Sequence, residues 1–294
     1  MELKQVKGNT YVLTGWKLQP VYLLPEGKCI LLDSGMPFER EKIDGVLQKA
    51  GLTVTGILCT HAHIDHASGN AWFQEKYHAK VVMPAGEAGQ CVTPLTIAAH
   101  VTEIDPALVM KDLGAMVCRV DRMIWPEEDE VELCAARFRV LHTPGHSPDH
   151  AAYITPDNVC YVGDALLSGR DLASKLPCSL NPVIDLKTKP KLKGLGCDRY
   201  IVAHKGVYEE IDGLVDENIR MLEDRLEAVR QLMDEPMSVD QVVAKACRTF
   251  DLRGEEIPKV GFYEKNVRNY VYALYDEGKL ELTVRDGVRH YKTL

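Results

Sequence analysis

Four side chains that can bind a metal ion stand within six residues, in the segment His61-Ala62-His63-Ile64-Asp65-His66. Imidazole nitrogens and carboxylate oxygens suit zinc, iron or manganese. The segment directly follows an apolar run at 56–60 that is typical of a strand. A turn after a strand can direct alternate side chains toward two neighbouring ions, and unrelated surface histidines rarely cluster in this way. The sequence therefore predicts a metal site at this turn.

Other metal-competent side chains follow other apolar runs, each just beyond the point where a strand would end. If these strands lie together, the side chains gather along one edge of a sheet layer, which is a common place for a site in α/β proteins. A single histidine or aspartate after a strand is usually a cap or a turn residue, but several in this arrangement indicate a site. These residues are Asp33, His146, Asp164 and His204.

Short apolar runs and helical patterns alternate through the first two hundred residues. The runs predict strands, and the periodic segments 38–50 and 70–77 predict helices. This order is typical of an α/β architecture rather than of a helix bundle. The predicted strands are 11–14, 21–24, 29–32, 56–60, 80–83, 137–142, 151–155, 159–162 and 200–203.

Residues 94–125 interrupt this alternation. Ala, Leu, Val and Met recur there at helical spacing, and Asp105-Pro106 is a helix start signal. We predict a helical insertion, which is consistent with a substrate lid, an oligomer contact or a packed structural excursion. A basic run follows at 173–193, which is usually a solvated face and which would also suit an anionic group of a substrate. Its lysines are Lys175, Lys187, Lys189, Lys191 and Lys193.

A different pattern begins after His204. Periodic segments predict three helices, with Ser238 capping the second, and Asp286-Gly287 predicts a tight hairpin. Helix, helix, helix and hairpin are the order of a winged helix-turn-helix, so we place a domain boundary near residue 212. The helices are 211–232, 239–250 and 264–277, and the hairpin strands are 279–284 and 288–292.

The bulk composition is that of an ordinary folded protein. Of the 294 residues, 46% are hydrophobic and 27% charged, and the formal net charge of −8 opposes binding to nucleic acid or acidic membranes. The nine cysteines form no C-x-x-C pair, which favours reduced thiols. The start MELKQVKGNT lacks the apolar core of a signal peptide, and no apolar run reaches the ~18 residues of a membrane span. We therefore expect a cytoplasmic protein without a membrane partner.

Taken in order, the five metal-competent segments resemble the metal-site motifs of the metallo-β-lactamase superfamily, over about residues 5–210. The resemblance implies an α/β fold, an αββα sandwich of two mixed sheets between helical layers. The catalytic domain would then occupy 1–211 and a winged-helix-like domain 212–294. The resemblance also implies the ligands: His61, His63 and His146 for one ion, and Asp65, His66 and His204 for the second, with Asp164 bridging.

The same resemblance implies roles for the residues around the ligands. Asp33 would orient a ligand histidine rather than bind metal, with a simple turn cap as its alternative, and His150 is assigned to structure. Two zinc ions, with iron or manganese as alternatives, would lower the pKa of a water held between them. The resulting hydroxide would attack an ester, a thioester or a related small-molecule bond, with Asp65 orienting it and accepting its proton.

Two groups within the superfamily suggest different substrates. Glyoxalase II-type thioesterases keep a bridging aspartate, but their Gly-Cys-Gly-(Lys/Arg) is absent after Gly163-Asp164, where residues 165–170 read ALLSGR. The last ligand is followed by Lys205-Gly206 in place of Glu-Tyr, so a glutathione thioester is not favoured. The C-terminal third resembles the tail of the β-lactamase-like protein 2 group, whose animal member is an endoribonuclease. A phosphodiesterase is therefore the alternative.

Nucleic acid is nevertheless the less favoured partner. The third C-terminal helix offers Lys265 and Arg268, but acidic residues outnumber basic ones across the tail, which suggests a tail that packs on the catalytic domain or shapes the pocket. A non-catalytic metal-binding regulatory protein is a third hypothesis, which the loss of a ligand would signal, and none is lost. The expected partners are a small-molecule substrate and, as is common among relatives, a second copy of the chain.

Overall fold

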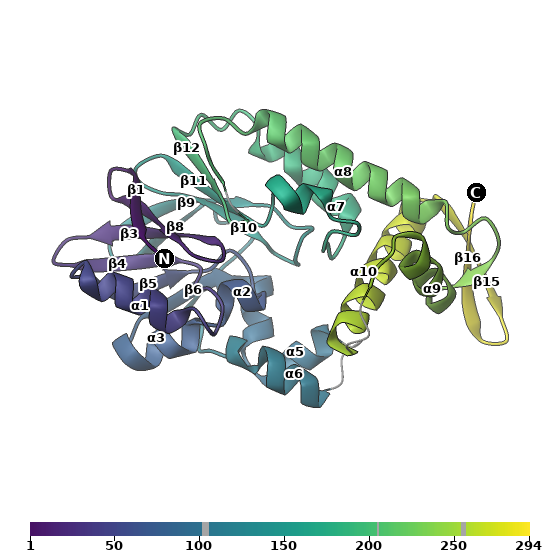
Figure 1. Ribbon diagram of the computed structural model, residues 1–294, viewed down its shortest axis with the longest axis horizontal. Helices are drawn as coiled ribbons and strands as arrows, with labels where there is room; N and C mark the ends of the chain where they lie inside the picture. The colour runs from purple at the N-terminus through teal and green to yellow at the C-terminus, as the bar shows by residue number, and fades with distance from the viewer. Residues whose placement is uncertain (102–105, 205, 254–256) are drawn as a thin grey trace.

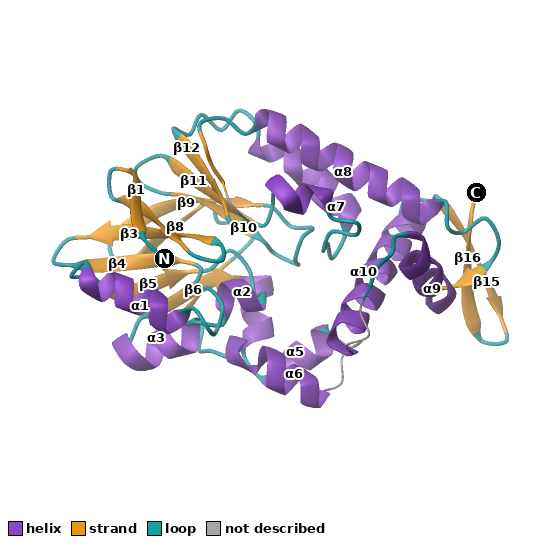
Figure 2. Cartoon of the chain, viewed as in Figure 1, coloured by secondary structure: helices purple, strands orange, loops and turns teal. Residues whose placement is uncertain are grey.

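The chain folds around two mixed β-sheets that lie face to face (Figures 1 and 2). The computed structural model describes residues 1–101, 106–204, 206–253 and 257–294. Within these residues one sheet has seven strands, in the order β1-β2-β3-β4-β5-β6-β7, and the other has six, in the order β13-β12-β11-β10-β9-β8. A three-stranded sheet, β14-β16-β15, belongs to the C-terminal region.

The first sheet is antiparallel from β1 to β4 and parallel from β4 to β7. The ends of β4 and β5 therefore open at one edge, where Asp33 and the predicted metal turn follow them. Its strands are β1 (Leu3–Lys7), β2 (Thr10–Thr14), β3 (Leu18–Leu24), β4 (Lys28–Leu32), β5 (Thr53–Leu58), β6 (Lys80–Pro84) and β7 (Arg122–Ile124).

In the second sheet β11 and β12 run parallel, whereas the other described neighbours are antiparallel. Because β11 and β12 end at the same edge, Asp164 and His204 emerge beside each other. The strands are β8 (Glu130–Leu133), β9 (Ala136–His142), β10 (Ala151–Ile154), β11 (Val159–Gly163), β12 (Arg199–Val202) and β13 (Gly206–Tyr208).

Apolar packing on both faces of the sheets fixes the layers, because burial removes this surface from water. Between the sheets, Ile30 of the first packs in one cluster with Phe138 of the second. Helices α1 (Arg40–Lys49) and α3 (Asn70–Tyr77) cover the outer face of the first sheet. The start of α8 (Asp212–Arg230) packs on the outer face of the second. These layers confirm the predicted αββα sandwich.

A group of short helices lies beside the first sheet in the region of the predicted helical insertion, and it begins at Ala85 rather than at residue 94. Thr93 begins α5 with a reciprocal capping box to Thr96, and Ile97 and Met116 join the core of the outer layer. Asp105, part of the predicted start signal, lies outside the described residues. The elements are α4 (Ala85–Ala88), η1 (Gly89–Cys91), α5 (Pro94–His100), α6 (Pro106–Leu113) and η2 (Gly114–Met116).

The C-terminal elements follow the order predicted for a winged helix, three helices and then a hairpin. Ser238 caps α9 in a capping box with Gln241, and Asp286 and Gly287 both have positive φ, as a tight hairpin turn requires. The third helix begins at Ile257 rather than at the predicted residue 264. The elements after α8 are β14 (Met237–Ser238), α9 (Val239–Thr249), α10 (Ile257–Asp276), β15 (Leu280–Arg285) and β16 (Val288–Thr293).

Helix α8 belongs to two cores. Val215 near its start packs with the second sheet, whereas Leu222 and Val229 pack with the C-terminal helices. The division of the chain near residue 212 stays a prediction, and the continuous helix fixes the two parts to each other. Among the described helices, none is long and apolar enough to cross a membrane.

The sequence predicted a solvated face for the basic run at 173–193. In the structure this run is only partly solvated. Lys189 is buried, where its ammonium donates to the carbonyl oxygen of Ala165 at 2.7 Å and lies 3.0 Å from an Asp185 carboxylate oxygen. Lys175 and Lys187 instead form ion pairs with acidic residues of the C-terminal region, at 3.1 and 2.8 Å. The ion pairs of Lys175 and Lys187 therefore connect residues 173–193 with the C-terminal region.

The Gly145→Ala substitution tests how tightly the loop after β9 is held. Gly145 has a φ of +131°, and a Cβ there would overlap the backbone of Asp185. We expect Gly145→Ala to lower the free energy of unfolding by about 1–3 kcal/mol more than Gly169→Ala does. The Cβ would overlap backbone atoms, which cannot move aside as the end of a flexible side chain can. Gly169 is the matched control, with a φ of +54° and open space around it. Equal losses in urea unfolding would contradict this account.

Candidate metal centre

The structure brings all seven predicted ligands together, in two adjoining groups. In each group one ligand atom from every residue lies within 4.8 Å of the others. Four of the ligands come from the turn after β5 and from α2 (Ile64–Ala67), and the other three follow β9, β11 and β12. The first group is His61, His63 and His146, and the second is Asp65, His66, Asp164 and His204.

The ligand nitrogens of the first group face one another. Nδ1 of His63 lies 3.0 Å from Nε2 of His61 and 3.1 Å from Nε2 of His146. Burial, reinforced by the neighbouring histidines, lowers the pKa of His61 and His63 well below the usual value, and burial also lowers the pKa of His146. His146 donates through Nδ1 to the carbonyl oxygen of Cys178, which leaves its Nε2 unprotonated. Three neutral imidazoles in this arrangement fit one divalent ion.

Asp164 lies between the two groups. Its Oδ1 is 3.2 Å from Nε2 of His66, and its Oδ2 is 3.2 Å from Nε2 of His204 and 3.8 Å from Nε2 of His146. Burial opposes ionisation of this carboxyl, but Lys17 and His66 outweigh burial and hold its pKa well below the usual value. An ionised carboxylate at this point can face two cations, as a bridging ligand must.

Asp33 lies behind His66, where the sequence predicts a supporting residue. Its Oδ2 accepts hydrogen bonds from Nδ1 of His66 and from the Tyr161 hydroxyl, both at 2.7 Å, and Oδ1 accepts from the Thr60 amide at 2.7 Å. The bond to Nδ1 directs Nε2 of His66 into the site. Burial disfavours the imidazolium of His66, but Asp164, Asp33 and Asp65 outweigh burial and raise its pKa to about 10.

Glu87 is a functional residue that the sequence analysis missed. It is buried on α4, and its carboxylate accepts from the Ala62 amide at 2.9 Å, the Ser147 hydroxyl at 2.7 Å and the Asp149 amide at 2.8 Å. These bonds tie the turn that carries His61 and His63 to the loop that carries His146. The local sequence Pro-Ala-Gly-Glu gives no signal of this role.

His150 has the structural position that the sequence predicted for it. Its Nε2 accepts a hydrogen bond from the Asp164 amide at 3.2 Å, and its Nδ1 lies 2.8 Å from the hydroxyl of Thr143. His150 therefore positions the backbone of Asp164, and it belongs to neither ligand group.

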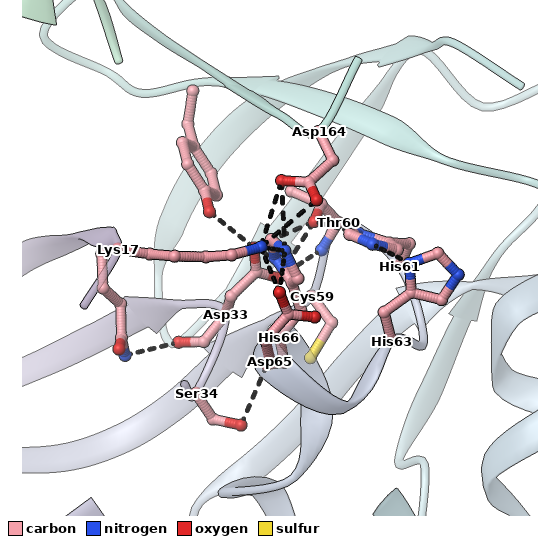
Figure 3. A network of polar contacts seen from close by, with 12 residues as sticks. Lys17, Asp33, Ser34, Cys59, Thr60, His61, His63, Asp65, His66 and Asp164 are labelled. Carbon is pink, nitrogen blue, oxygen red and sulfur yellow. Dashed lines mark hydrogen bonds and ion pairs between the residues drawn. The ribbon is translucent and has the colours of Figure 1, made fainter. Parts of the chain in front are cut away.

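Lys17 is the second residue that the sequence analysis missed. Its side chain reaches into the second ligand group from the turn between β2 and β3 (Figure 3). The ammonium forms an ion pair with Asp65 and lies 3.2 Å from Oδ2 of Asp164 and 2.7 Å from Nε2 of His66. Burial opposes the charge of Lys17, but Asp164 and Asp65 raise its pKa. No sequence motif around Lys17 predicts this contact.

A cavity of about 420 Å³ opens onto the ligands. Its wall away from the ligands is formed by mostly apolar side chains of the short helices beside the first sheet, and a third wall comes from helix α10. The short helices and the residue after α5 contribute Gln90, Ile97, His100, Val101, Val109, Leu113 and Met116, and α10 contributes Gly261, Phe262, Lys265 and Asn266. The tail therefore shapes the pocket, as the charge balance of the sequence suggested.

The fold and the site together define an αββα protein with a His/Asp metal centre, and comparisons with known proteins agree. The family model of the metallo-beta-lactamase superfamily matches residues 14–204. The chain belongs to the metallo-beta-lactamase superfamily. Its donor set of imidazoles and carboxylates fits divalent metal ions.

Similar proteins include enzymes and solved structures. A hydroxyacylglutathione hydrolase of Rhodopseudomonas palustris (strain BisA53) is 29% identical over 163 residues, which cover 54% of this chain and 53% of the relative. The chain thus spans about half the length of this relative. A metallo-beta-lactamase family protein of Thermus thermophilus has a TM-score of 0.73 at 21% identity, covering 99% of this chain and 96% of that protein. A Beta-lactamase domain protein of Burkholderia ambifaria has a TM-score of 0.70 at 21% identity, covering 99% and 93%.

Replacing Asp33 by Asn tests the support of His66. We expect about 10–100-fold weaker metal binding, because a neutral amide holds the imidazole less strongly than a carboxylate does. The backbone is retained, since Asn tolerates the φ of +65° found at Asp33. Affinity is measured by competition with a chromophoric chelator.

The matched control is Asp44→Asn on α1. Asp44 is also buried, and its carboxylate lies 2.6 Å from the ammonium of Lys76. This variant should lose stability but keep the metal affinity of the wild type. Unchanged metal affinity in Asp33→Asn would show that Asp33 is only a turn residue.

Proposed function

We propose that this chain is a metallo-hydrolase that cleaves an ester or thioester bond of a small molecule with an apolar acyl group. The single observation behind the proposal is the cavity, which is apolar along the insertion and ends at the ligand side chains. Its volume of about 420 Å³ lies within the range of small-molecule sites. An apolar group in the cavity would leave the bond to be cleaved beside the metal centre.

Divalent metal ions held by the two ligand groups would help to activate the attacking water. When bound, divalent ions lower the pKa of a coordinated water and polarise a carbonyl oxygen. His61, His63 and His146 would hold one ion, and Asp65, His66 and His204 a second, with Asp164 between them. Zinc is the metal that we propose, and elemental analysis distinguishes it from iron and manganese.

Asp65 is the residue that we propose for orienting the attacking water. It lines the cavity and belongs to the second ligand group. Burial opposes its ionisation, but His66 and Lys17 outweigh burial and lower its pKa to about 2. Asp65 therefore stays ionised at neutral pH, so its carboxylate can accept a hydrogen bond from the water. We propose that it also takes up the proton of this water.

The relatives named hydroxyacylglutathione hydrolase support thioester cleavage as the reaction. The glutathione portion of such a substrate is not supported, because residues 165–170 lack the Gly-Cys-Gly-(Lys/Arg) feature. An apolar acyl group is supported by the side chains of the insertion. The position of helix α10 at the cavity makes the tail part of a small-molecule site in this proposal, rather than a nucleic-acid reader.

A substrate panel tests the proposal. It contains straight-chain acyl esters and thioesters of increasing length, glutathione thioesters, lactones, phosphodiesters and RNA. We expect kcat/KM to rise about three- to fourfold for each added methylene until the cavity is filled, because each buried methylene contributes about 0.8 kcal/mol. His63→Ala and Asp164→Ala should each abolish the activity.

A cavity-filling variant tests where the acyl group binds. Val101→Phe should shorten the preferred acyl chain and spare short substrates, because Val101 lines the cavity. Leu95→Phe is the matched control on helix α5, which ends just before Val101, at a side chain that is 78% exposed. Cleavage of RNA or phosphodiesters without cleavage of any ester or thioester would favour the endoribonuclease alternative instead.

Asn266 adds a polar contact to this apolar pocket. It lies on α10, is 2% exposed and lines the cavity, and its Nδ2 has no hydrogen-bond partner among the described residues. A buried donor without a partner destabilises a protein, so its presence in a cavity points to a ligand acceptor. We propose that Asn266 donates to an oxygen of the substrate.

Replacing Asn266 by Leu separates this role from a structural one. We expect kcat/KM to fall about five- to tenfold, which corresponds to one hydrogen bond. The free energy of unfolding should stay the same or rise, because a buried donor without a partner is removed. Asn269→Leu is the control, since Nδ2 of Asn269 donates to the Ser179 carbonyl oxygen at 3.1 Å and its loss should destabilise the fold. A destabilised Asn266→Leu with unchanged kcat/KM would refute the role.

A further inference from the structure

Lys17 makes close contacts with the second ligand group. Its ammonium contacts three of the four members of that group, namely a carboxylate oxygen of Asp65, Oδ2 of Asp164 and Nε2 of His66. Figure 3 shows the extended side chain directed at Asp164, with Asp65 and His66 around its end. The lysine is only 8% exposed.

The atoms that Lys17 contacts are those that would bind an ion. Nδ1 of His66 donates to Asp33, so Nε2 is the atom that a metal would use, and this nitrogen lies 2.7 Å from the ammonium. Asp164 likewise turns toward Lys17 the Oδ2 atom that lies near His204. The ammonium therefore occupies the position to which the second ligand group is directed.

An ion and the ammonium cannot share this position. Metal–ligand bonds to histidine and carboxylate are about 2.0–2.2 Å long, so an ion bound to these atoms would stand where the ammonium stands and would repel its charge. The ligand nitrogens of the first group, in contrast, face one another. An ion can enter that group without displacing Lys17.

The charges around Lys17 explain why its ammonium lies in the second ligand group. Asp65 and Asp164 hold two carboxylates with little access to water, and removing such charges from water is unfavourable unless a cation lies close to them. The ammonium supplies one positive charge at this point. A divalent ion supplies two, so it replaces the ammonium at the cost of moving Lys17 away.

We propose that Lys17 is an internal competitor for the second metal ion, so that the first ion binds tightly in the three-histidine group and the second binds only by displacing the ammonium. In its present position the Nζ of Lys17 also lies 5.8 Å from the ring centroid of Trp16, which is within reach of a cation–π contact. This inference rests on the metal site and not on the proposed substrate, so metal binding decides it whatever the substrate panel gives.

Isothermal titration calorimetry with Zn²⁺, on protein whose metal has been removed by a chelator, measures the two binding events. For the wild type we expect one tight equivalent and a second that is weaker by at least about tenfold, which corresponds to 1.4 kcal/mol. Lys17→Met keeps the length of the side chain and removes its charge, so the Kd of the second ion should fall at least about tenfold. The Kd of the first ion should not change.

Two control variants separate the charge from other effects. Lys17→Arg keeps the charge and should keep the second ion weak. Lys7→Met removes a surface lysine that pairs with Asp198, and it should bind both ions as the wild type does. Equal affinity of the two ions in the wild type, or an unchanged second Kd in Lys17→Met, would overturn the proposal.

If the Lys17→Met variant does not fold without metal, a measurement on the wild type tests the proposal instead. Amine-directed acetylation followed by mass spectrometry reports how accessible Lys17 is. Labelling of Lys17 should stay low with one equivalent of Zn²⁺ and rise when the second ion binds, whereas labelling of Lys7 should stay constant. Labelling of Lys17 that does not change between one equivalent and saturation would overturn the proposal.

Discussion

Several carboxylates lie among five histidines with little access to water, and the rest of the site depends on how their charge is balanced. A desolvated carboxylate is costly unless donors or cations surround it. Asp33 receives hydrogen bonds from His66, Tyr161 and Thr60, while Asp65 and Asp164 face Lys17. Divalent metal adds positive charge to the same space, so metal binding and the stability of this region are linked.

The two sheets bring the charged groups together because their strands end at a common edge. Parallel pairing of β11 with β12 places Asp164 and His204 side by side, and β5 delivers the turn with the remaining histidines. Glu87 then fixes two of these loops to each other through buried hydrogen bonds to Ala62, Ser147 and Asp149. Loop positions in the site are therefore set by the outer layer as well as by the sheets.

The insertion and the C-terminal region are walls of the same cavity although they lie far apart in the sequence. Figure 1 shows α10 to the right of the sandwich, with one end near α5 and α6, and side chains from all three helices line the cavity. Helix α8 runs through both cores and holds the tail in place. The likeness to the Thermus thermophilus protein covers 99% of the chain, so this tail is part of the shared fold.

The sequence by itself determined the strands with apolar runs, the capped and periodic helices and the hairpin at Asp286-Gly287, because each leaves a local pattern. Its motifs also pointed to the seven residues that the structure gathers into the two ligand groups. It missed β1, β7, β8, β13 and β14, which are short or partly exposed and lack a clear apolar run. Only the tertiary structure decided the roles of Glu87, Lys17 and Lys189. Their function comes from partners distant in the chain, and burial turns an ordinary charged residue into a structural one when such a partner lies within hydrogen-bond distance.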